Sequence, residues 1–337
     1  MEERAELAVQ KDVPKLKAGD RISIIKYKPS FSLVFSVIIL VLIVALFGGV
    51  TKGAFFGRNV LMGIFNQALI IGTMATAVSF IYTTGNLDIS VGNSMALAAT
   101  IGALIYNRTG NIALMVVTAV TVGIILMVFN CTLSVVFQIK TVTVAIVMIQ
   151  LYSAIVSEIL GPDSLKVDYS VCKMLENAGF RYAMFLGYFI LCIIVYHFTP
   201  VGRRLRFVGG NPNCADQTGI SAKRSTYVSF FMAGIGVGVA AIFTIIRTGS
   251  VSTEVGSGMG MDVMLATVLG GMSIFGGARS NAYAGLMGAL TVSALNKGLL
   301  MAGVSSTAIQ GVRGIVFLLL VFLNSERPST LPTRQQV

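Results

Sequence analysis

Long apolar runs alternate with short polar segments along most of the chain. The runs fall at about residues 31–50, 60–84, 89–106, 112–136, 142–160, 182–199, 226–246, 262–277, 282–302 and 308–324. A helix of about 20 apolar residues crosses the ~30 Å hydrocarbon core of a bilayer, because each residue adds about 1.5 Å. The pattern therefore predicts an all-α, polytopic integral membrane protein with about ten transmembrane helices.

Two polar tails flank the apolar sequence, and one long polar segment divides it. Residues 1–30 and 325–337 form polar tails, and residues 199–225 form the longest polar interruption between two apolar blocks. We therefore expect one transmembrane domain over 31–324, with a loop at 199–225. The first apolar run should remain as a span, because the tail before it is long and charged and lacks the small-residue cleavage site of a signal peptide.

The distribution of basic residues predicts which side of the membrane each loop faces. Lys and Arg are enriched in the cytoplasmic loops of membrane proteins. With the N-terminus inside, ten spans leave 16 of the 25 Lys and Arg residues in inside segments and seven in outside segments. One span more or fewer before the central loop would move its five bases outside. Both termini are therefore predicted to be cytoplasmic.

Composition supports a membrane protein and argues against other classes. Of the 337 residues, 55% are hydrophobic and 12% are charged, whereas a soluble domain carries about 25% charged residues. The net charge of +11 does not indicate a nucleic-acid partner, because the bases lie in separated loops. The four Cys form no CxxC pair and the single His stands alone, so no disulfide framework or metal site is expected. Without a P-loop, HExxH or GxSxG motif, we expect neither an enzyme nor a cofactor.

The central loop carries the pattern of a short capped helix. Asn211 is a suitable N-cap, Pro212 suits the first turn and Gly219 is a suitable stop, which predicts a helix over about 212–218. The basic residues around it are Arg203, Arg204, Arg206, Lys223 and Arg224. Such a helix can dock into the groove of a separate partner protein. The alternative is a solvated basic loop that only fixes the topology.

Asp88 is the acidic residue most deeply flanked by apolar sequence, at a break between the second and third spans. In one interpretation Asn86, Asp88 and Ser90 lie beside a pathway and bind a polar solute or hold a gate. In the other, Asp88 caps the third span by accepting hydrogen bonds from the N–H groups of its first turn. The two are compatible. Asn66 and Gln67 in the second span are further candidate pathway residues.

Small residues concentrate in the second half of the chain. The glycines of this half include Gly234, Gly236, Gly238, Gly270, Gly271, Gly276, Gly277, Gly285 and Gly288. Small side chains let helices approach closely in lipid, and this density also allows broken helices beside a cavity. We therefore expect close packing and irregular backbone near a pathway. The Gly/Ser-rich stretch 248–261 is expected to be either a mobile outer lip or a linker.

Four motifs follow one another along the chain. They are Thr84–Ala98 (TGNLDISVGNSMALA), Gly202–Ile220, Val268–Gly277 (VLGGMSIFGG), and the pair Asn296–Leu299 and Gln310–Gly314. Together they resemble bacterial ABC-transporter permeases of the ribose/xylose/galactose type, over roughly residues 55–324. The chain departs from that family's pattern at Asn86, at Asn130-Cys131, over Lys140–Val147 and at Gly260-Met261, where a pathway or gate would be shaped.

The resemblance implies the permease subunit of an ABC importer in the bacterial inner membrane. It implies a homo- or heterodimeric transmembrane domain surrounded by membrane lipid, a separate cytoplasmic ATPase subunit, and an extracytoplasmic solute-binding protein that delivers a sugar. In such importers the region of Arg203, Gly210, Asn211, Ala215 and Gly219 contacts the ATPase. We therefore expect a translocation pathway for a small polar solute such as a monosaccharide. The alternative is an ATP-independent secondary transporter or channel.

Overall fold

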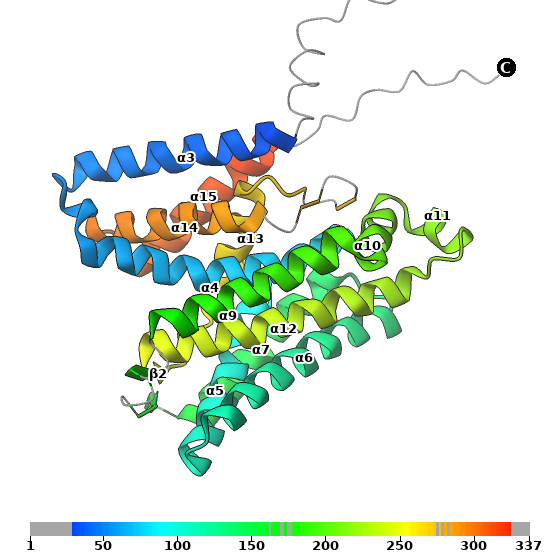
Figure 1. Cartoon of the computed structure of the whole chain (residues 1–337), viewed down its shortest axis with the longest axis horizontal. Coiled ribbons are helices and arrows are strands. Elements are labelled where there is room, and N and C mark those ends of the chain that lie inside the picture. Colours follow the sequence, from blue (N-terminus) through cyan, green and yellow to red (C-terminus); the bar gives the residue numbers. More distant parts are fainter. Residues whose placement is uncertain are drawn as a thin grey trace, which may run out of the picture.

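The computed structural model of the chain describes residues 29–161, 163–168, 172–173, 177–273, 276–277, 280–281 and 284–324, and helices dominate them (Figure 1). In chain order the elements are α3 (Pro29–Val50), η1 (Ala54–Phe56), α4 (Arg58–Thr83), α5 (Val91–Thr109), α6 (Ile112–Val136), α7 (Thr141–Leu160), β1 (Leu165–Lys166), α9 (Ala178–Ile193), η2 (Ile194–Phe198), α10 (Pro200–Gly210), α11 (Pro212–Gln217), α12 (Ala222–Thr248), β2 (Ser250–Val251), α13 (Met259–Leu269), α14 (Ala284–Met301) and α15 (Ser306–Asn324). The predicted all-α fold class is confirmed.

Two helices, α4 and α12, form the centre of the molecule. In their most apolar windows 83% and 89% of the residues are buried, whereas the shares for α6, α7 and the span that begins in α9 are 22–28%. These five segments are long and apolar enough to cross a membrane. The outer helices expose apolar side chains such as Val117, Ile146 and Leu186, which are suited to contact with lipid rather than water.

Glycine permits the close contact between α6 and α12. A Cβ on Gly234 of α12 would lie 2.5 Å from the Cα of Ile124 in α6, and a Cβ on Gly123 would lie 2.8 Å from the backbone nitrogen of Gly238. Larger residues would push the two helices apart, and in lipid this backbone approach is a main source of helix association. The close packing expected for the glycine-rich half is confirmed here.

A helix stands at each predicted span, but the prediction for 262–277 is wrong in extent. Helix α13 has 11 residues and ends at Leu269, so it is about 16 Å long and crosses about half of the ~30 Å core. Positive φ angles at Gly271 and Gly276 (86° and 75°) end its regularity, and turns with β2 precede it. The irregular backbone expected in this half is therefore confirmed.

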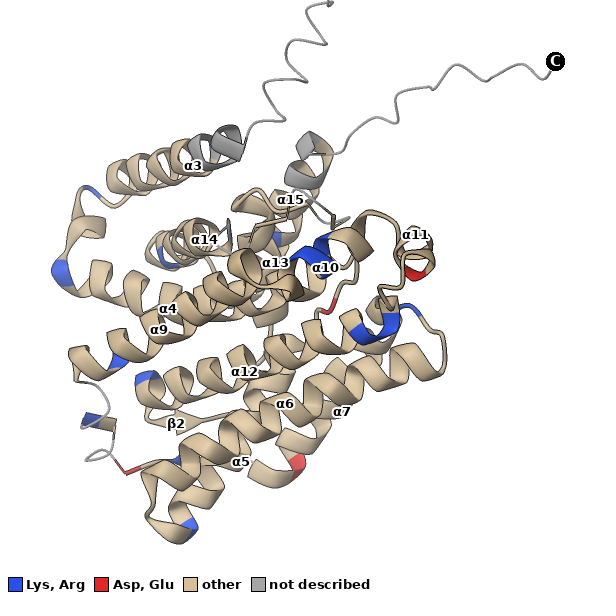
Figure 2. Cartoon of the chain, turned by 45° about the vertical axis from the view of Figure 1, so that its right-hand side comes forward, with Lys and Arg blue, Asp and Glu red and all other residues tan. Residues whose placement is uncertain are grey.

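Most Lys and Arg positions lie at the two ends of the bundle (Figure 2). One end carries α10, α11 and the start of α12, and the other carries the antiparallel pair β1 and β2, in which Leu165 pairs with Val251. The predicted tails fall almost wholly on 1–28 and 325–337, which lie outside the described residues. The cytoplasmic placement of both termini therefore stays a prediction.

The segment 199–225 contains more helix than we predicted. Helix α11 matches the helix expected over 212–218, but α10 precedes it and was not expected. Thr199 caps α10 by accepting the N–H of Val201, and Pro200 occupies the first turn, where no N–H is needed. The pair Thr199-Pro200 carries the same signal as Asn211-Pro212, so the sequence did contain the information for this second helix.

Candidate functional site

The break between α4 and α5 holds a buried polar network. Asp88 Oδ1 accepts hydrogen bonds from the N–H and the hydroxyl of Ser90, at 2.8 and 2.6 Å. Asp88 Oδ2 accepts from Asn130 Nδ2 of α6 at 3.2 Å, and Asn130 Oδ1 accepts from the Tyr152 hydroxyl of α7 at 2.7 Å. These side chains are at most 2% exposed. One continuous chain of hydrogen bonds therefore ties the break to α6 and α7.

The prediction that Asp88 caps the third span is wrong in detail. Helix α5 begins at Val91 with Ser90 as its N-cap residue, and the backbone N–H that Asp88 accepts is that of Ser90, before the first turn. Asp88 thus fixes the conformation of the loop. Asn86 lies at the same break, where its Oδ1 accepts from the Thr141 hydroxyl at 2.9 Å. The structure brings Asn86, Asp88 and Ser90 together, and their role beside a pathway stays a prediction.

Asn66 and Gln67 lie apart from this network. They stand in the first half of α4, and about 17 residues of helix, or about 25 Å, separate Asn66 from the end of α4 at Thr83. The Gln67 side-chain oxygen lies 3.5 Å from a guanidinium nitrogen of Arg247, at the last turn of α12. The five candidate pathway residues therefore form two separate groups.

The positions at which the chain departs from the resembled pattern meet at the break. Asn86 and Thr141 bond to each other, and Asn130 bonds to Asp88. Gly260 of α13 lies against the same loop, because a Cβ on it would overlap the carbonyl oxygen of Ile89. These residues are distant in sequence, but the fold gathers them in one region.

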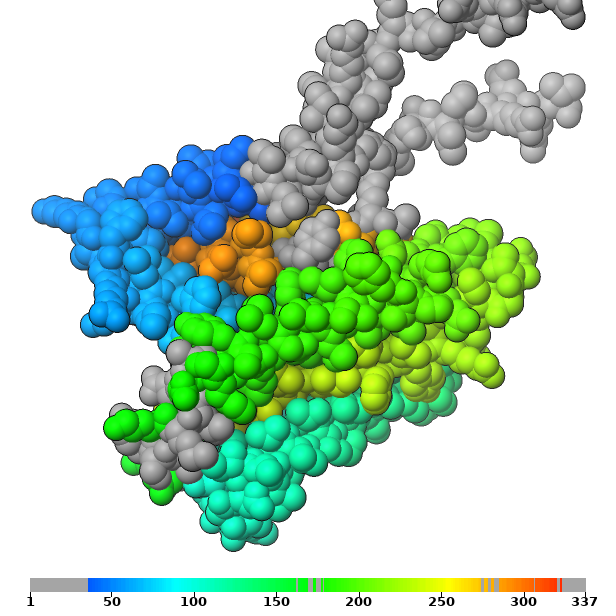
Figure 3. Space-filling model, viewed as in Figure 1, coloured from blue at the N-terminus to red at the C-terminus, as the bar shows by residue number. Residues whose placement is uncertain are grey.

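The end formed by α10 and α11 is the second candidate site, and it projects from the bundle in Figure 3. Asn211 Oδ1 caps α11 by accepting the N–H groups of Asn213 and Cys214, at 3.0 and 3.2 Å. Gly219 stops the helix with a φ of 82°, which an L-residue adopts at a cost of about 1–2 kcal/mol. The predicted capping of this short helix is therefore confirmed.

The predicted coupling residues divide into surface and anchoring positions. Arg203, Gly210 and Asn211 are exposed and line a groove of about 600 Å³ between α10 and α11. Ala215 is fully buried and holds α11 against the bundle. The groove is open to a partner, whereas Ala215 anchors the helix that forms one wall and the exposed Gly219 ends it.

A π-helical turn, η2, joins α9 to α10 and places Tyr196 at a junction. The Tyr196 hydroxyl lies 2.9 Å from the Thr83 hydroxyl at the end of α4 and donates to the Ser280 carbonyl at 2.6 Å. The Arg206 guanidinium of α10 lies 5.2 Å above the tyrosine ring. A Cβ on Gly209 would overlap the Thr83 carbonyl oxygen. The exposed α10 is thus in direct contact with the end of α4 that begins the helix break.

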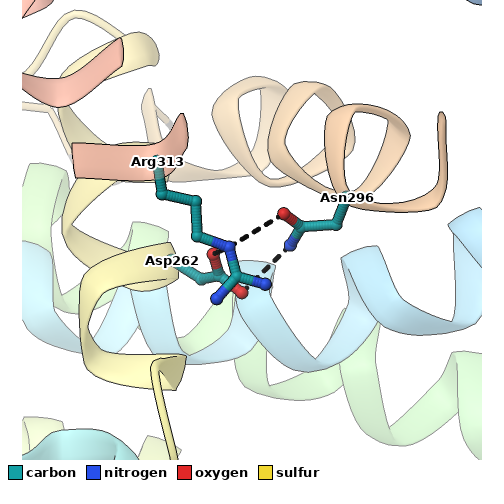
Figure 4. A network of polar contacts seen from close by, with 3 residues as sticks. All are labelled: Asp262, Asn296 and Arg313. Carbon is teal, nitrogen blue, oxygen red and sulfur yellow. Dashed lines mark hydrogen bonds and ion pairs between the residues drawn. The ribbon is translucent and has the colours of Figure 1, made fainter. Parts of the chain in front are cut away.

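A buried ion pair joins the last three helices (Figure 4). Arg313 Nε of α15 lies 2.9 Å from Asp262 Oδ1 of α13 and donates to Asn296 Oδ1 of α14 at 3.0 Å. Asn296 Nδ2 donates to Asp262 Oδ2, also at 3.0 Å. Sequence reasoning missed this cluster. The available signal was that Arg313 in an apolar span needs a buried partner, and Asp262 is the acid of another span.

The family described as "Branched-chain amino acid transport system / permease component" matches residues 60–322. This chain belongs to that permease family. The match begins just inside α4 and ends within α15, so it includes the helix break, the α10–α11 end and the Asp262 cluster. The resemblance seen in the four motifs is thereby confirmed at the level of the permease class.

Several curated permeases resemble the chain over most of its length. The fructose import permease protein of Rhizobium meliloti is 27% identical over 85% of this chain and 83% of the relative. The ribose import permease protein of Escherichia coli K12 is 25% identical over 87% and 93%. An autoinducer 2 import system permease protein of Photorhabdus laumondii is 26% identical over 85% and 89%. No solved structure shows a significant match.

Family membership and the long apolar helices make this permease a multi-pass inner membrane protein. The family consists of permease subunits, which are not themselves enzymes.

Proposed function

We propose that the chain is the permease subunit of an ABC importer and forms the translocation pathway for a small polar solute, a monosaccharide. A separate ATPase subunit hydrolyses ATP, a second permease subunit, identical or related, completes the transmembrane domain, and an extracytoplasmic binding protein delivers the solute. The substrate class follows from the relatives, whose names state fructose and ribose import.

The observation that carries this proposal is the exposed α10–α11 end. Its short helix is capped at both ends, its groove is open, and its basic side chains Arg203 and Arg204 are exposed. Such a surface is complementary to a partner with acidic groups. Because α10 contacts Thr83 at the end of α4, a movement of the bound partner would displace α4 as well. A channel that works without an ATPase would not need an exposed docking surface of this kind.

The first test reverses the charge of this end. We expect Arg203→Glu with Arg204→Glu to reduce co-purification of the P-loop ATPase and sugar uptake at least tenfold, because acidic side chains would repel an acidic docking surface. Arg108→Glu is the matched control, since Arg108 is exposed in the last turn of α5. The measurement is a pull-down of the tagged permease from its native membrane, with quantification of the bound ATPase.

Two outcomes would contradict the proposal. A normal amount of ATPase bound to the reversed variant would show that this end is not the docking surface. A homo-oligomer with retained uptake and no ATPase would support an ATP-independent transporter instead.

A further inference from the structure

A polar cavity, open at the surface of the described chain, lies beside the helix break, and its lining residues Gln150, Glu254 and Ser257 are exposed. It has a volume of about 350 Å³ and is bounded by the start of α5, by Ile149–Ser153 of α7 and by residues 253–261. Ile149–Ser153 is the central part of α7, so the cavity lies near half the depth of the membrane. Its volume is within the range of about 300–1,000 Å³ that small-molecule sites occupy.

The Gly/Ser-rich stretch before α13 forms one wall of this cavity. Successive turns fold it, since Val255 N–H bonds to Ser252 and Ser257 N–H bonds to Glu254. Glycine lets it approach α5, because a Cβ on Gly92 would lie 2.7 Å from the backbone nitrogen of Gly260. The stretch therefore packs against α5 and is more than a simple linker, and its role as a mobile outer lip stays a prediction.

The cavity lining is rich in groups that bind hydroxyls. Its polar side chains are Asn93, Gln150, Ser153, Thr253, Glu254 and Ser257. Asn93 Nδ2 donates one of its two N–H groups to the Ile149 carbonyl at 3.2 Å, which leaves the other N–H as a donor and the Asn93 side-chain oxygen as an acceptor. Hydroxyl and amide groups can each donate or accept, so they complement a molecule whose own hydroxyls do the same.

The charges in the cavity lining favour an uncharged ligand over an anionic one. Glu254 is the one ionisable side chain among the lining residues, and no Lys or Arg is among them. An anionic solute would meet the Glu254 carboxylate, and the base nearest the lining, Arg313 behind Gly258, is already paired with Asp262. The apolar side chains Ile89, Ile149 and Met261 offer surface to the C–H groups of a ligand.

We propose that this cavity is the site where the permease holds its solute during translocation, and that the solute is an uncharged polyhydroxylated molecule of monosaccharide size. The assignment rests on the proposed function and adds the place and residues of binding. Gln150 and Ser153 on α7 and Glu254 on the opposite wall make the specific contacts. Because the site adjoins Ile89 in the Asp88 loop, a movement of that loop would change its shape.

The test uses the complete transporter in membrane vesicles and radiolabelled D-fructose, D-ribose and D-xylose as probes. We expect Ser153→Val and Gln150→Leu to lower the uptake rate at saturating sugar at least tenfold, with the ATPase still bound. Ser157→Val is the matched control for Ser153→Val. It makes the same change one turn further along α7, at a residue outside the cavity lining, and should leave uptake within twofold of wild type.

A second measurement covers the case in which these variants do not assemble. In Ser153→Cys vesicles, a cationic methanethiosulfonate reagent should inhibit uptake, and the transported sugar should slow the inhibition. The reagent is added outside right-side-out vesicles, where it does not reach Cys214 on the predicted cytoplasmic end, so wild type and Ser157→Cys should be unaffected. Sugar uptake that is normal in Gln150→Leu and insensitive to the reagent in Ser153→Cys would overturn the site while leaving the importer proposal intact. A wild-type transporter that takes up none of the three sugars would refute the proposed substrate class and this assignment with it.

Discussion

Arg313 and Asp262 show how a charge is tolerated within the apolar bundle. Their side chains are 14% and 4% exposed, and an ion removed from water is costly unless it is paired and hydrogen-bonded. Here the two charges pair directly, and Asn296 bonds to both. The cluster therefore fixes the relative position of α13, α14 and α15 next to the cavity.

Breaking this ion pair should be more damaging than removing it. We expect Arg313→Met to destabilise the permease by about 3–5 kcal/mol, because it leaves a buried carboxylate unpaired. Adding Asp262→Asn should restore most of the loss, since a neutral amide can still bond to Asn296. Thermal unfolding of the purified protein in lipid nanodiscs, arranged as a double-mutant cycle, measures both effects.

Arg247→Met is the control for this cycle. Arg247 is exposed and its contact with Gln67 is long, at 3.5 Å, so its loss should lower stability by less than about 1 kcal/mol. A single Arg313→Met variant as stable as Arg247→Met would contradict a structural role for the ion pair.

At the scale of elements, the irregular segments contact one another. The π-helical η2, the end of α4 and the turn that holds Gly277 meet around Thr83, whose carbonyl oxygen accepts the N–H of Gly277 at 3.0 Å. Regular helices transmit force along their axes but change shape little, whereas π-turns and glycine turns are common at functional sites and hinges. We infer that movement of α10 reaches the Asp88 loop through this junction.

Tyr196→Phe tests the junction with a small change. It removes the hydroxyl that bonds to both Thr83 and Ser280, and it should weaken the packing of η2 against α4 by about 1–3 kcal/mol. We expect sugar uptake to fall severalfold while the ATPase stays bound and continues to hydrolyse ATP, because docking and movement are no longer tightly linked. Uptake and ATP hydrolysis are measured together on the reconstituted complex.

Tyr82→Phe is a close control for this variant. Tyr82 is 1% exposed, lies next to Thr83, and its hydroxyl has no hydrogen-bond partner in the described part of the chain. Its loss should leave uptake within twofold of wild type. If Tyr196→Phe and Tyr82→Phe had the same uptake, the Tyr196 hydroxyl would not be the coupling contact.

At the scale of the whole molecule, the two ends of the bundle differ in what they expose. One end carries the basic α10–α11 surface and the other carries the β1–β2 pair. The positive-inside rule assigns the basic end to the cytoplasm. The helix breaks and the cavity lie between these ends, as a pathway that opens alternately to each side requires.

The native cysteines provide a direct test of this orientation. Cys214 in α11 is exposed, whereas Cys131, Cys172 and Cys192 are buried. For the permease expressed without its ATPase, we expect a membrane-impermeant maleimide to label inside-out vesicles and not right-side-out vesicles. Cys214→Ser should abolish the signal. Labelling of right-side-out vesicles through Cys214 would place α11 outside and reverse the predicted topology.

The fold class, the family and the short helix α11 follow from local sequence signals. Apolar runs long enough to cross a bilayer need no long-range information, because backbone hydrogen bonds must be satisfied locally in lipid. Local signals also fix the caps, as Asn211-Pro212 and Gly219 demonstrate. Thr199-Pro200 carries the same kind of signal for α10.

Which polar residues contact one another depends on how the helices pack. Three contacts join residues that are far apart in the chain: Asp88 with Asn130, Asp262 with Arg313, and α7 with residues 253–261 across the polar cavity. Residue type predicts that a buried polar group needs a partner but not which partner it finds. That choice depends on how α4 and α12 orient the helices around them, and on glycines such as Gly92 that let backbones come close enough for the network to form.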